Sequence, residues 1–358
     1  MESALAFALL LGFMVLVHEL GHFAVAKLAG IKVEEFGIGF PPRLFAFRRG
    51  ETEYSLNAVP LGGFVRLLGE EDPAQPRSFA RARKRWRIAI LLAGSAMNMV
   101  AAALFFTVAY TAGWPTVTQT EVEIFRVVPG SPADRAGLQR GDVILSLAGQ
   151  PVARTADLRR ITEANLGATI PVELRRAGAR QTLQVTPRAQ WPEGDGPIGI
   201  GIVDGPATIE PVRYPPLEAL GRGVRELGRS VLLTLSVPVL AVQGLVPLEF
   251  LRPVGPVGLY QATSQAAAET ARSGWWFPLL YMAATLGAGL GVANLLPIPG
   301  LDGGRLVFIL LEAIRGRRIA PEREGLIHLV GMALLVSLVI VITYFDILFP
   351  VAVDFSLR

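Results

Sequence analysis

The stretch VLVHELGHFAVA (residues 15–26) places two histidines and a glutamate inside a segment that otherwise reads as lipid-embedded helix. The whole chain has only three histidines, and two of them, His18 and His22, lie in this stretch. Ionisable side chains are costly in hydrocarbon and are usually functional where they occur there. The placement of these side chains therefore needs a chemical explanation.

The composition indicates a membrane protein with some extramembrane mass. The chain has 358 residues, of which 51% are hydrophobic and 18% charged, and its mean hydropathy of +0.45 is too high for an ordinary soluble protein. Because there is no cysteine, a metal site cannot use thiolate ligands. The chain has a net charge of +4, and membrane proteins often carry basic residues in their cytoplasmic loops. We therefore expect the lipid bilayer as a partner and no nucleic acid.

Four stretches are long and apolar enough to cross a bilayer, which takes roughly 20 helical residues. They lie at Ala4–Ala29, Ile88–Gly113, Trp276–Leu296 and Leu326–Phe345. The first lacks a basic start and is read as a retained span rather than a signal peptide. Basic residues gather between spans one and two and between spans three and four, which predicts cytoplasmic loops there, with both termini and residues 115–270 outside. The cluster Arg81–Arg87 is interpreted as a topology determinant.

Residues 44–59, LFAFRRGETEYSLNAV, read as a β-hairpin turning at Arg49-Gly50. The following PLGGFVRLLGE (60–70) is expected to supply a turn and an apolar return. Backbone of this kind at membrane depth needs surrounding protein or a wet cavity. A cytoplasmic surface hairpin is the alternative that periodicity leaves open.

Residues 121–190 predict a compact α+β unit with a strand at Val143–Leu147, a helix over 155–164 capped by Thr155, and a hairpin at Ala177-Gly178. The run SPADRAGLQRGDVILSLAGQPV (131–152) makes this unit resemble a PDZ domain of the bacterial, permuted kind. Such a fold can bind a peptide carboxyl terminus by strand addition, or it can act as a rigid spacer or steric screen. Residues 213–252 are interrupted by prolines and glycine and predict an interfacial helix pair.

The spacing of His18-Glu19-Leu20-Gly21-His22 is that of HExxH. Positions i and i+4 share one helix face, so both histidines can hold a single Zn²⁺ ion, and Glu19 can accept a proton from a water on it. A catalytic zinc needs a third protein ligand. Asp302, in NLLPIPGLDGGRL (294–306), supplies a carboxylate at the expected cytoplasmic end of span three. Two alternatives to metal binding remain. His18 and His22 would have a structural role in helix packing, and Asp302 would be an ordinary aspartate in a turn.

HELGH, PLGGFVRLLGE, the PDZ-like insert, PVGPVGLYQA (253–262) and NLLPIPGLDGGRL together resemble the site-2 protease family of intramembrane zinc metalloproteases. The resemblance covers nearly the whole chain. It implies a bacterial cytoplasmic-membrane enzyme that cleaves transmembrane segments of single-span proteins, such as anti-sigma factors or remnant signal peptides. It assigns His18, His22 and Asp302 as ligands, Glu19 as general base and Asn294 as a catalytic and substrate-positioning residue. Where the best-known enterobacterial members carry two PDZ domains, this chain has room for one.

The resemblance implies that the hairpin at residues 44–59 is the membrane-associated β-element of the family, with a mobile joint near it, and we add a hypothesis for its exposed edge. We expect Tyr54, Ser55 and Leu56 to hold an unwound substrate by pairing at an exposed strand edge, with Gly62 and Gly63 as a mobile joint. The predicted fold class is thus a polytopic α-helical membrane protein of four transmembrane helices, with a membrane-associated β-hairpin and an inserted extracytoplasmic PDZ domain. Its expected segments are an N-terminal membrane core (1–114), the PDZ domain (115–205), an interfacial linker (206–274) and a C-terminal membrane core (275–358).

Two other functions remain open from sequence. A catalytically idle scaffold would recruit partners through the PDZ domain, and a metal transporter would line several spans with polar residues. Spans two and four are nearly free of polar residues, which disfavours transport. His328 is interpreted as an interfacial side chain and Asp346 as a solvated one.

Overall fold

The computed structural model describes residues 2–70, 75–192, 194–247, 252–353 and 355. The chain divides into two units, each described by itself below. The membrane unit comprises Met1–Trp114 and Arg213–Ser356, and the PDZ-like unit comprises Pro115–Val212. The strand β8 (Ile200–Val212) runs past residue 205, so the predicted end of the PDZ domain falls inside a strand.

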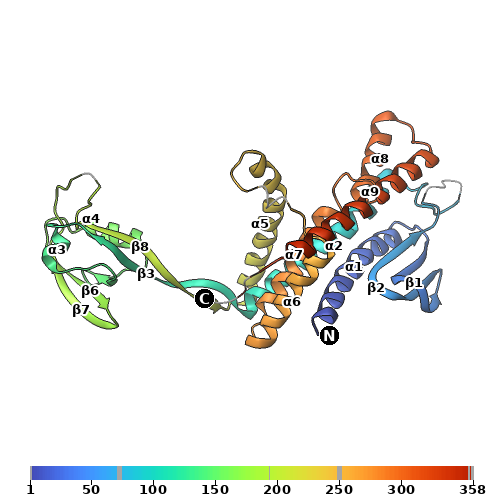
Figure 1. The fold of residues 1–358 in the computed structure, drawn as a ribbon. Helices are drawn as coiled ribbons and strands as arrows, with labels where there is room; N and C mark the ends of the chain where they lie inside the picture. Colours follow the sequence, from blue (N-terminus) through green and yellow to red (C-terminus); the bar gives the residue numbers. More distant parts are fainter. Residues whose placement is uncertain (1, 71–74, 193, 248–251, 354, 356–358) are drawn as a thin grey trace. The chain divides into compact units, whose positions relative to one another are not determined.

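Within the described residues, three helices are long and apolar enough to span a membrane. They are α1 (Glu2–Leu28), α2 (Lys84–Gly113) and α9 (Pro321–Leu348), and the apolar α7 (Phe277–Ala293) is shorter. The α2 helix packs against α1, α7, α5 (Pro216–Val242) and α8 (Asp302–Arg315), which makes it the centre of the bundle (Figure 1). Three to four apolar helices agree with the predicted class of membrane protein.

The region 213–247 differs from the predicted interfacial helix pair. It forms one helix, α5, which continues through Pro238 and ends at Val242. Residues 243–247 form no second helix, and residues 248–251 lie outside the described residues. Gly223 lets α5 approach α2 closely, because a Cβ built there would lie 2.5 Å from Oγ1 of Thr107. Contact with α2, rather than an amphipathic surface alone, therefore determines where this helix lies.

The β-hairpin is longer than predicted and is folded back on itself. Strands β1 (Val33–Arg49) and β2 (Thr52–Leu67) flank the turn at Gly50, so residues 60–67 are strand and not turn. Residues 35–38 of β1 pair with 63–66 on one side and with 53–56 on the other, and 53–56 pair in turn with 45–48. Tyr54, Ser55 and Leu56 consequently have partners on both sides. Among the described pairs, the segments at the edges of the sheet are 63–67 and 45–49.

Two charged residues expected at the surface are buried. Asp346, near the end of α9, is 0% exposed and accepts hydrogen bonds from the backbone N–H groups of Gly255 and Gly258, at 3.0 and 2.8 Å. It also pairs with Arg252, so it anchors the start of α6 (Pro256–Ser273) to α9 and is not solvated as predicted. Arg87, from the cluster read as a topology determinant, is buried and donates to Glu312 of α8 at 2.6 Å.

The PDZ-like unit contains a six-stranded sheet and two short helices. The strands lie in the order β7-β6-β4-β3-β8, with β5 paired to β4, and their bounds are β3 (Trp114–Val127), β4 (Val143–Leu147), β5 (Gln150–Pro151), β6 (Ile170–Arg176) and β7 (Ala179–Val185). The predicted strand at 143–147 and the turn at Ala177-Gly178 are confirmed. Helix α3 (Pro132–Ala136) begins after Ser131, and α4 (Thr155–Glu163) has Arg154 rather than Thr155 as its N-cap. The Asp157 carboxylate accepts the Arg154 N–H, which stabilises that start.

Candidate active site and metal centre

His18, His22 and Asp302 bring three metal-ligating atoms to one point. The Nε2 atoms of the two histidines are 3.0 Å apart, and the Oδ2 atom of Asp302 lies 3.1 Å from the first and 3.2 Å from the second. Both imidazoles are buried, and the side chain of Asp302 is 18% exposed. Two residues one helical turn apart thus meet a third that lies 284 positions along the chain.

Small residues allow α2 to pass directly behind this cluster. A Cβ built at Gly94 of α2 would lie 2.4 Å from Nε2 of His22 and 2.6 Å from Cε1 of His18. A Cβ at Gly21, inside HELGH, would lie 2.4 Å from the carbonyl oxygen of Ala93. Both distances are below any ordinary contact, so only glycine lets the two helices approach this closely. Gly21 of HELGH therefore allows the close packing of α1 against α2, whereas its neighbours His18, Glu19 and His22 are the candidates for metal binding and catalysis.

The charges and tautomers of the cluster suit a cation. The Nδ1 atom of His22 donates to the carbonyl oxygen of Ile90 at 2.7 Å, which leaves a lone pair on its Nε2 in the neutral ring. One ring nitrogen from each histidine and one carboxylate oxygen of Asp302 converge within 4.8 Å of one another. Two imidazoles and one carboxylate fit a catalytic zinc, which uses three protein ligands and leaves a fourth position open.

The loop between α7 and α8 places Asp302 at the first position of α8. Prolines 297 and 299 end the preceding helix, and Gly303 and Gly304 lie where a Cβ would be 2.2 and 2.3 Å from carbonyl oxygens of residues 296 and 298. His328 of α9 accepts a hydrogen bond from the backbone N–H of Gly300 at 3.1 Å. Its interpretation as an interfacial side chain was incomplete, because it supports the loop that carries Asp302.

One cavity of about 290 Å³ is lined by candidate site residues that the sequence analysis found in separate parts of the chain. Its lining includes the three candidate ligands together with Glu19 and Asn294. Gly63 of β2 lies against Glu19, since a Cβ built there would be 3.2 Å from Cγ of Glu19. The edge segment 63–67 therefore passes next to the candidate general base, and Phe64, Val65 and Leu67 also line the cavity.

The other hairpin residues singled out from sequence lie away from this cavity. Ser55 is buried and donates to the carboxylate of Glu35 at 2.6 Å, while Tyr54 stacks on Phe47. Leu56 is 47% exposed, and Gly62 lies inside β2 where a Cβ would meet the ring of Phe40 at 2.2 Å. None of these four is among the residues that line the cavity. The predicted edge at residues 54–56 was wrong, because those residues pair on both sides.

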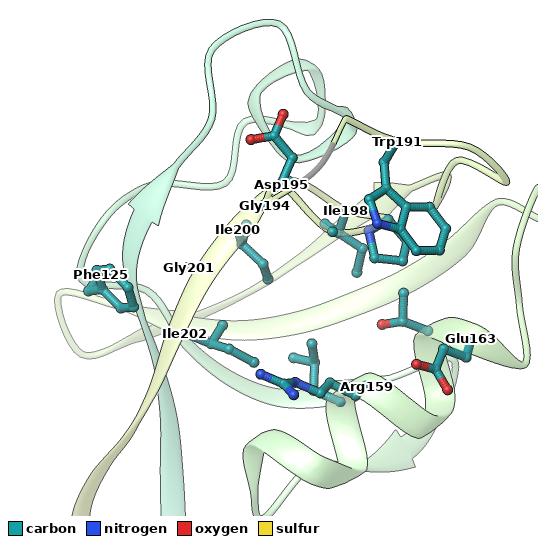
Figure 2. Close-up of a pocket in the computed structure, with 15 residues that line it drawn as sticks. Phe125, Arg159, Glu163, Trp191, Gly194, Asp195, Ile198, Ile200, Gly201 and Ile202 are labelled. Atoms are coloured by element: carbon teal, nitrogen blue, oxygen red, sulfur yellow. The ribbon is translucent and has the colours of Figure 1, made fainter.

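A second cavity, of about 460 Å³, lies within the PDZ-like unit between α4 and β8 (Figure 2). Ile200 and Ile202 of β8 form its apolar floor with Ile198 and Leu158. In Figure 2, Arg159 and Glu163 come from α4, and Trp191 and Asp195 come from the loop that precedes β8. Among the described strands β8 is the last in the order, and an edge strand of this kind can accept an added strand from a peptide.

Comparison with known proteins identifies the family. The sequence profile of Peptidase family M50 matches residues 6–338. The chain belongs to peptidase family M50. With its apolar helices, this M50 peptidase is a membrane-embedded enzyme of the site-2 protease type.

Several relatives of this M50 peptidase match over almost their whole length. A protein of Clostridium acetobutylicum is 33% identical, with 95% of this chain and 96% of that one covered. A protein of Clostridium perfringens is 35% identical, with 94% and 96% covered, and both carry provisional zinc metalloprotease names. The zinc metalloprotease RasP of Oceanobacillus iheyensis is 30% identical, with 97% and 99% covered. A PDZ domain of an SdrC-like protein from Listeria monocytogenes is 21% identical over 25% of this chain and 93% of that one, with a TM-score of 0.22.

Sequence reasoning missed the residues that support the site from other elements. Gly94 and Asn98 of α2, Ile90, and the ion pair of Arg305 with Glu70 at 2.8 Å all border the cavity or its ligands. A signal was present in α2, where Gly94, Asn98 and Ala102 recur at a spacing of four, the pattern of close helix packing in membranes. No local pattern indicates Arg305 and Glu70, which are 235 positions apart.

Proposed function

We propose that this chain is an intramembrane zinc metalloendopeptidase that cleaves the transmembrane segments of single-span membrane proteins. The observation that carries the proposal is the convergence of His18, His22 and Asp302 beside Glu19 in one cavity. The two histidines and the glutamate belong to a helix long and apolar enough to span a membrane. Peptide hydrolysis at membrane depth is the chemistry that this combination supports best.

The three ligands hold the metal, and the remaining residues handle substrate and protons. When bound, zinc supplies a Lewis acid that polarises the scissile carbonyl and lowers the pKa of an attacking water. Glu19 takes a proton from that water at its carboxylate as the oxygen adds to the carbonyl carbon. Glu19 then gives the proton to the amide nitrogen as the carbon–nitrogen bond breaks. Asn294, at the end of α7, donates its side-chain N–H to the carbonyl oxygen as negative charge develops there.

A helical substrate must be unwound before its peptide bonds can react, because an intact helix keeps its backbone groups bonded internally. The edge segment 63–67 is the candidate that holds the unwound chain. It lies next to Glu19, lines the cavity, and pairs on one side only among the described strands. This segment replaces Tyr54, Ser55 and Leu56 as the proposed site of strand addition, with Gly63 allowing close approach of the backbone.

The membrane, the orientation of the chain in it and the substrate class are inferred from the distribution of basic residues and from the family resemblance. The enzyme lies in a bacterial cytoplasmic membrane with its termini and PDZ-like unit outside and its active site toward the cytoplasm. Its substrates are anti-sigma factors or remnant signal peptides. The groove between α4 and β8 receives the carboxyl terminus of a peptide, since β8 is an edge strand of the sheet and Ile200 and Ile202 line the groove with apolar side chains.

The test begins with the metal and continues with cleavage. Purified protein should contain about one zinc per chain, and His22→Ala should lose it, because one imidazole and one carboxylate hold zinc poorly. Glu19→Gln should keep the zinc and lose cleavage of a single-span reporter by a factor of about 10² to 10⁴. Glu218→Gln, a carboxylate on α5 in an ion pair with Arg222, is the matched control.

A scaffold without catalysis gives a different pattern. If the well-folded wild-type protein contains no zinc, or if Glu19→Gln cleaves the reporter at the wild-type rate, the protease mechanism is wrong. The PDZ-like unit would then carry the function, and binding of partners would survive both substitutions.

A further inference from the structure

Asn98 of α2 is a buried polar residue that the mechanism above does not use. It is 1% exposed, and its amide nitrogen lies 3.4 Å from Nδ1 of His18, nitrogen to nitrogen. Its amide oxygen is fully buried and has no hydrogen-bond partner within the described residues. A buried, unpaired carbonyl oxygen costs about 1–3 kcal/mol, so a side chain of this kind requires an explanation.

The chemistry of the neighbouring histidine supplies one. An imidazole that binds a metal through Nε2 carries its hydrogen on Nδ1, and that N–H needs an acceptor. His22 meets this requirement through the carbonyl oxygen of Ile90 at 2.7 Å. On His18, the group that faces Nδ1 is the amide of Asn98. An N–H donated to Nδ1 by Asn98 would instead place the hydrogen of His18 on Nε2, which points at Asp302 and His22.

A half turn of the amide gives the buried oxygen a donor and keeps the zinc-binding tautomer of His18, while the amide nitrogen moves to the position of the present oxygen. It exchanges oxygen and nitrogen, so the oxygen faces Nδ1 of His18 and gains a donor, and Nε2 of His18 keeps its lone pair. The α7 helix lies close to the α2 backbone at this position. A Cβ built at Gly287 of α7 would be 3.3 Å from the backbone oxygen of Asn98.

We propose that Asn98 is a positioning residue whose amide oxygen accepts the Nδ1–H of His18 and holds that ring in the tautomer that binds zinc through Nε2. The inference rests on the proposed function for the identity of the ligands. The two histidines of HELGH are then oriented by two different groups of the same helix, the Ile90 backbone and the Asn98 side chain.

The test is the zinc dissociation constant, measured by competition with a chromogenic chelator on full-length protein in detergent. The chain has no cysteine and only one histidine outside HELGH, so competing strong zinc sites are few. Asn98→Leu, close in volume but without an acceptor, should weaken zinc binding about 10- to 100-fold. Asn98→Asp keeps an acceptor oxygen and should stay within about threefold of wild type. Ser95→Ala, one turn earlier on α2 and equally buried, is the control and should not change the affinity.

The outcomes distinguish a failure of the proposed zinc ligands from a failure of the proposed role of Asn98. Wild-type protein without zinc, or zinc retained by His22→Ala, overturns the proposed ligands themselves. If His22→Ala loses zinc while Asn98→Leu binds it like wild type, only the role of Asn98 is wrong. Equal weakening in Asn98→Leu and Asn98→Asp, with thermal stability unchanged, also overturns it, because the acceptor would then not matter. If Asn98→Leu does not fold, Asn98→Ala takes its place, with the same rescue by aspartate expected.

Discussion

Gly94 offers a direct test of how closely α2 passes behind the histidines. In Gly94→Ala the new methyl carbon would lie 2.4 Å from Nε2 of His22, whereas ordinary contacts begin at 3.4 Å. The ring or the helix must therefore move by about 1 Å, roughly half the length of a zinc–nitrogen bond of about 2.0–2.1 Å. A displacement of this size at a reacting centre costs about 10² in rate. We expect kcat/KM on a single-span reporter to fall about 100-fold and zinc affinity to fall with it.

The control is Gly289→Ala on α7, where a built Cβ has no heavy atom within 4 Å. Both variants add one methyl group to an apolar helix, so a general effect on helix propensity would appear in both. Overpacking at Gly94 should also lower the free energy of unfolding by about 1–3 kcal/mol, measured as a fall in Tm in detergent. Wild-type zinc affinity and cleavage in Gly94→Ala would refute the close approach of α2 to the imidazoles.

Two further predictions concern the rest of the fold. Asp346→Ala removes the acceptor for two buried backbone N–H groups and for Arg252, so it should destabilise the protein by about 3 kcal/mol. Equal Tm values for it and for Glu322→Ala, at the exposed start of the same helix, would contradict this. The full-length chain should bind a labelled peptide with an apolar, free carboxyl terminus at least about tenfold more tightly than its amidated form, because charged groups strengthen hydrogen bonds. Equal binding of the two peptides by fluorescence anisotropy would favour the spacer role for the PDZ-like unit.

The outcome for the hairpin illustrates the limit of periodicity. Alternation in residues 44–59 correctly predicts strands and a turn near Gly50. It does not predict that 53–56 is enclosed between 35–38 and 45–48, which leaves 63–67 as the edge beside Glu19. Strand pairing depends on where the chain folds back, and that is set by packing against α1 rather than by side-chain alternation.

Asp346 and Arg87 illustrate the same limit for charge. Each lies near an end of an apolar segment, where a solvated or lipid-facing side chain is the ordinary expectation. Each is buried because a distant partner faces it, Gly255 and Gly258 in one case and Glu312 in the other. Composition gives no information about such partners.

What the sequence alone determines is local. Apolar runs of about 20 residues predict the membrane helices, and a spacing of four places His18 and His22 on one face with Glu19 beside them. Tertiary structure decides which distant groups complete that face. It brings Asp302 to within 3.2 Å of both histidines and puts Gly94 and Asn98 behind them. The physical reason is that backbone geometry fixes the relations of residues three or four apart, whereas contacts across 284 positions depend on how whole helices pack.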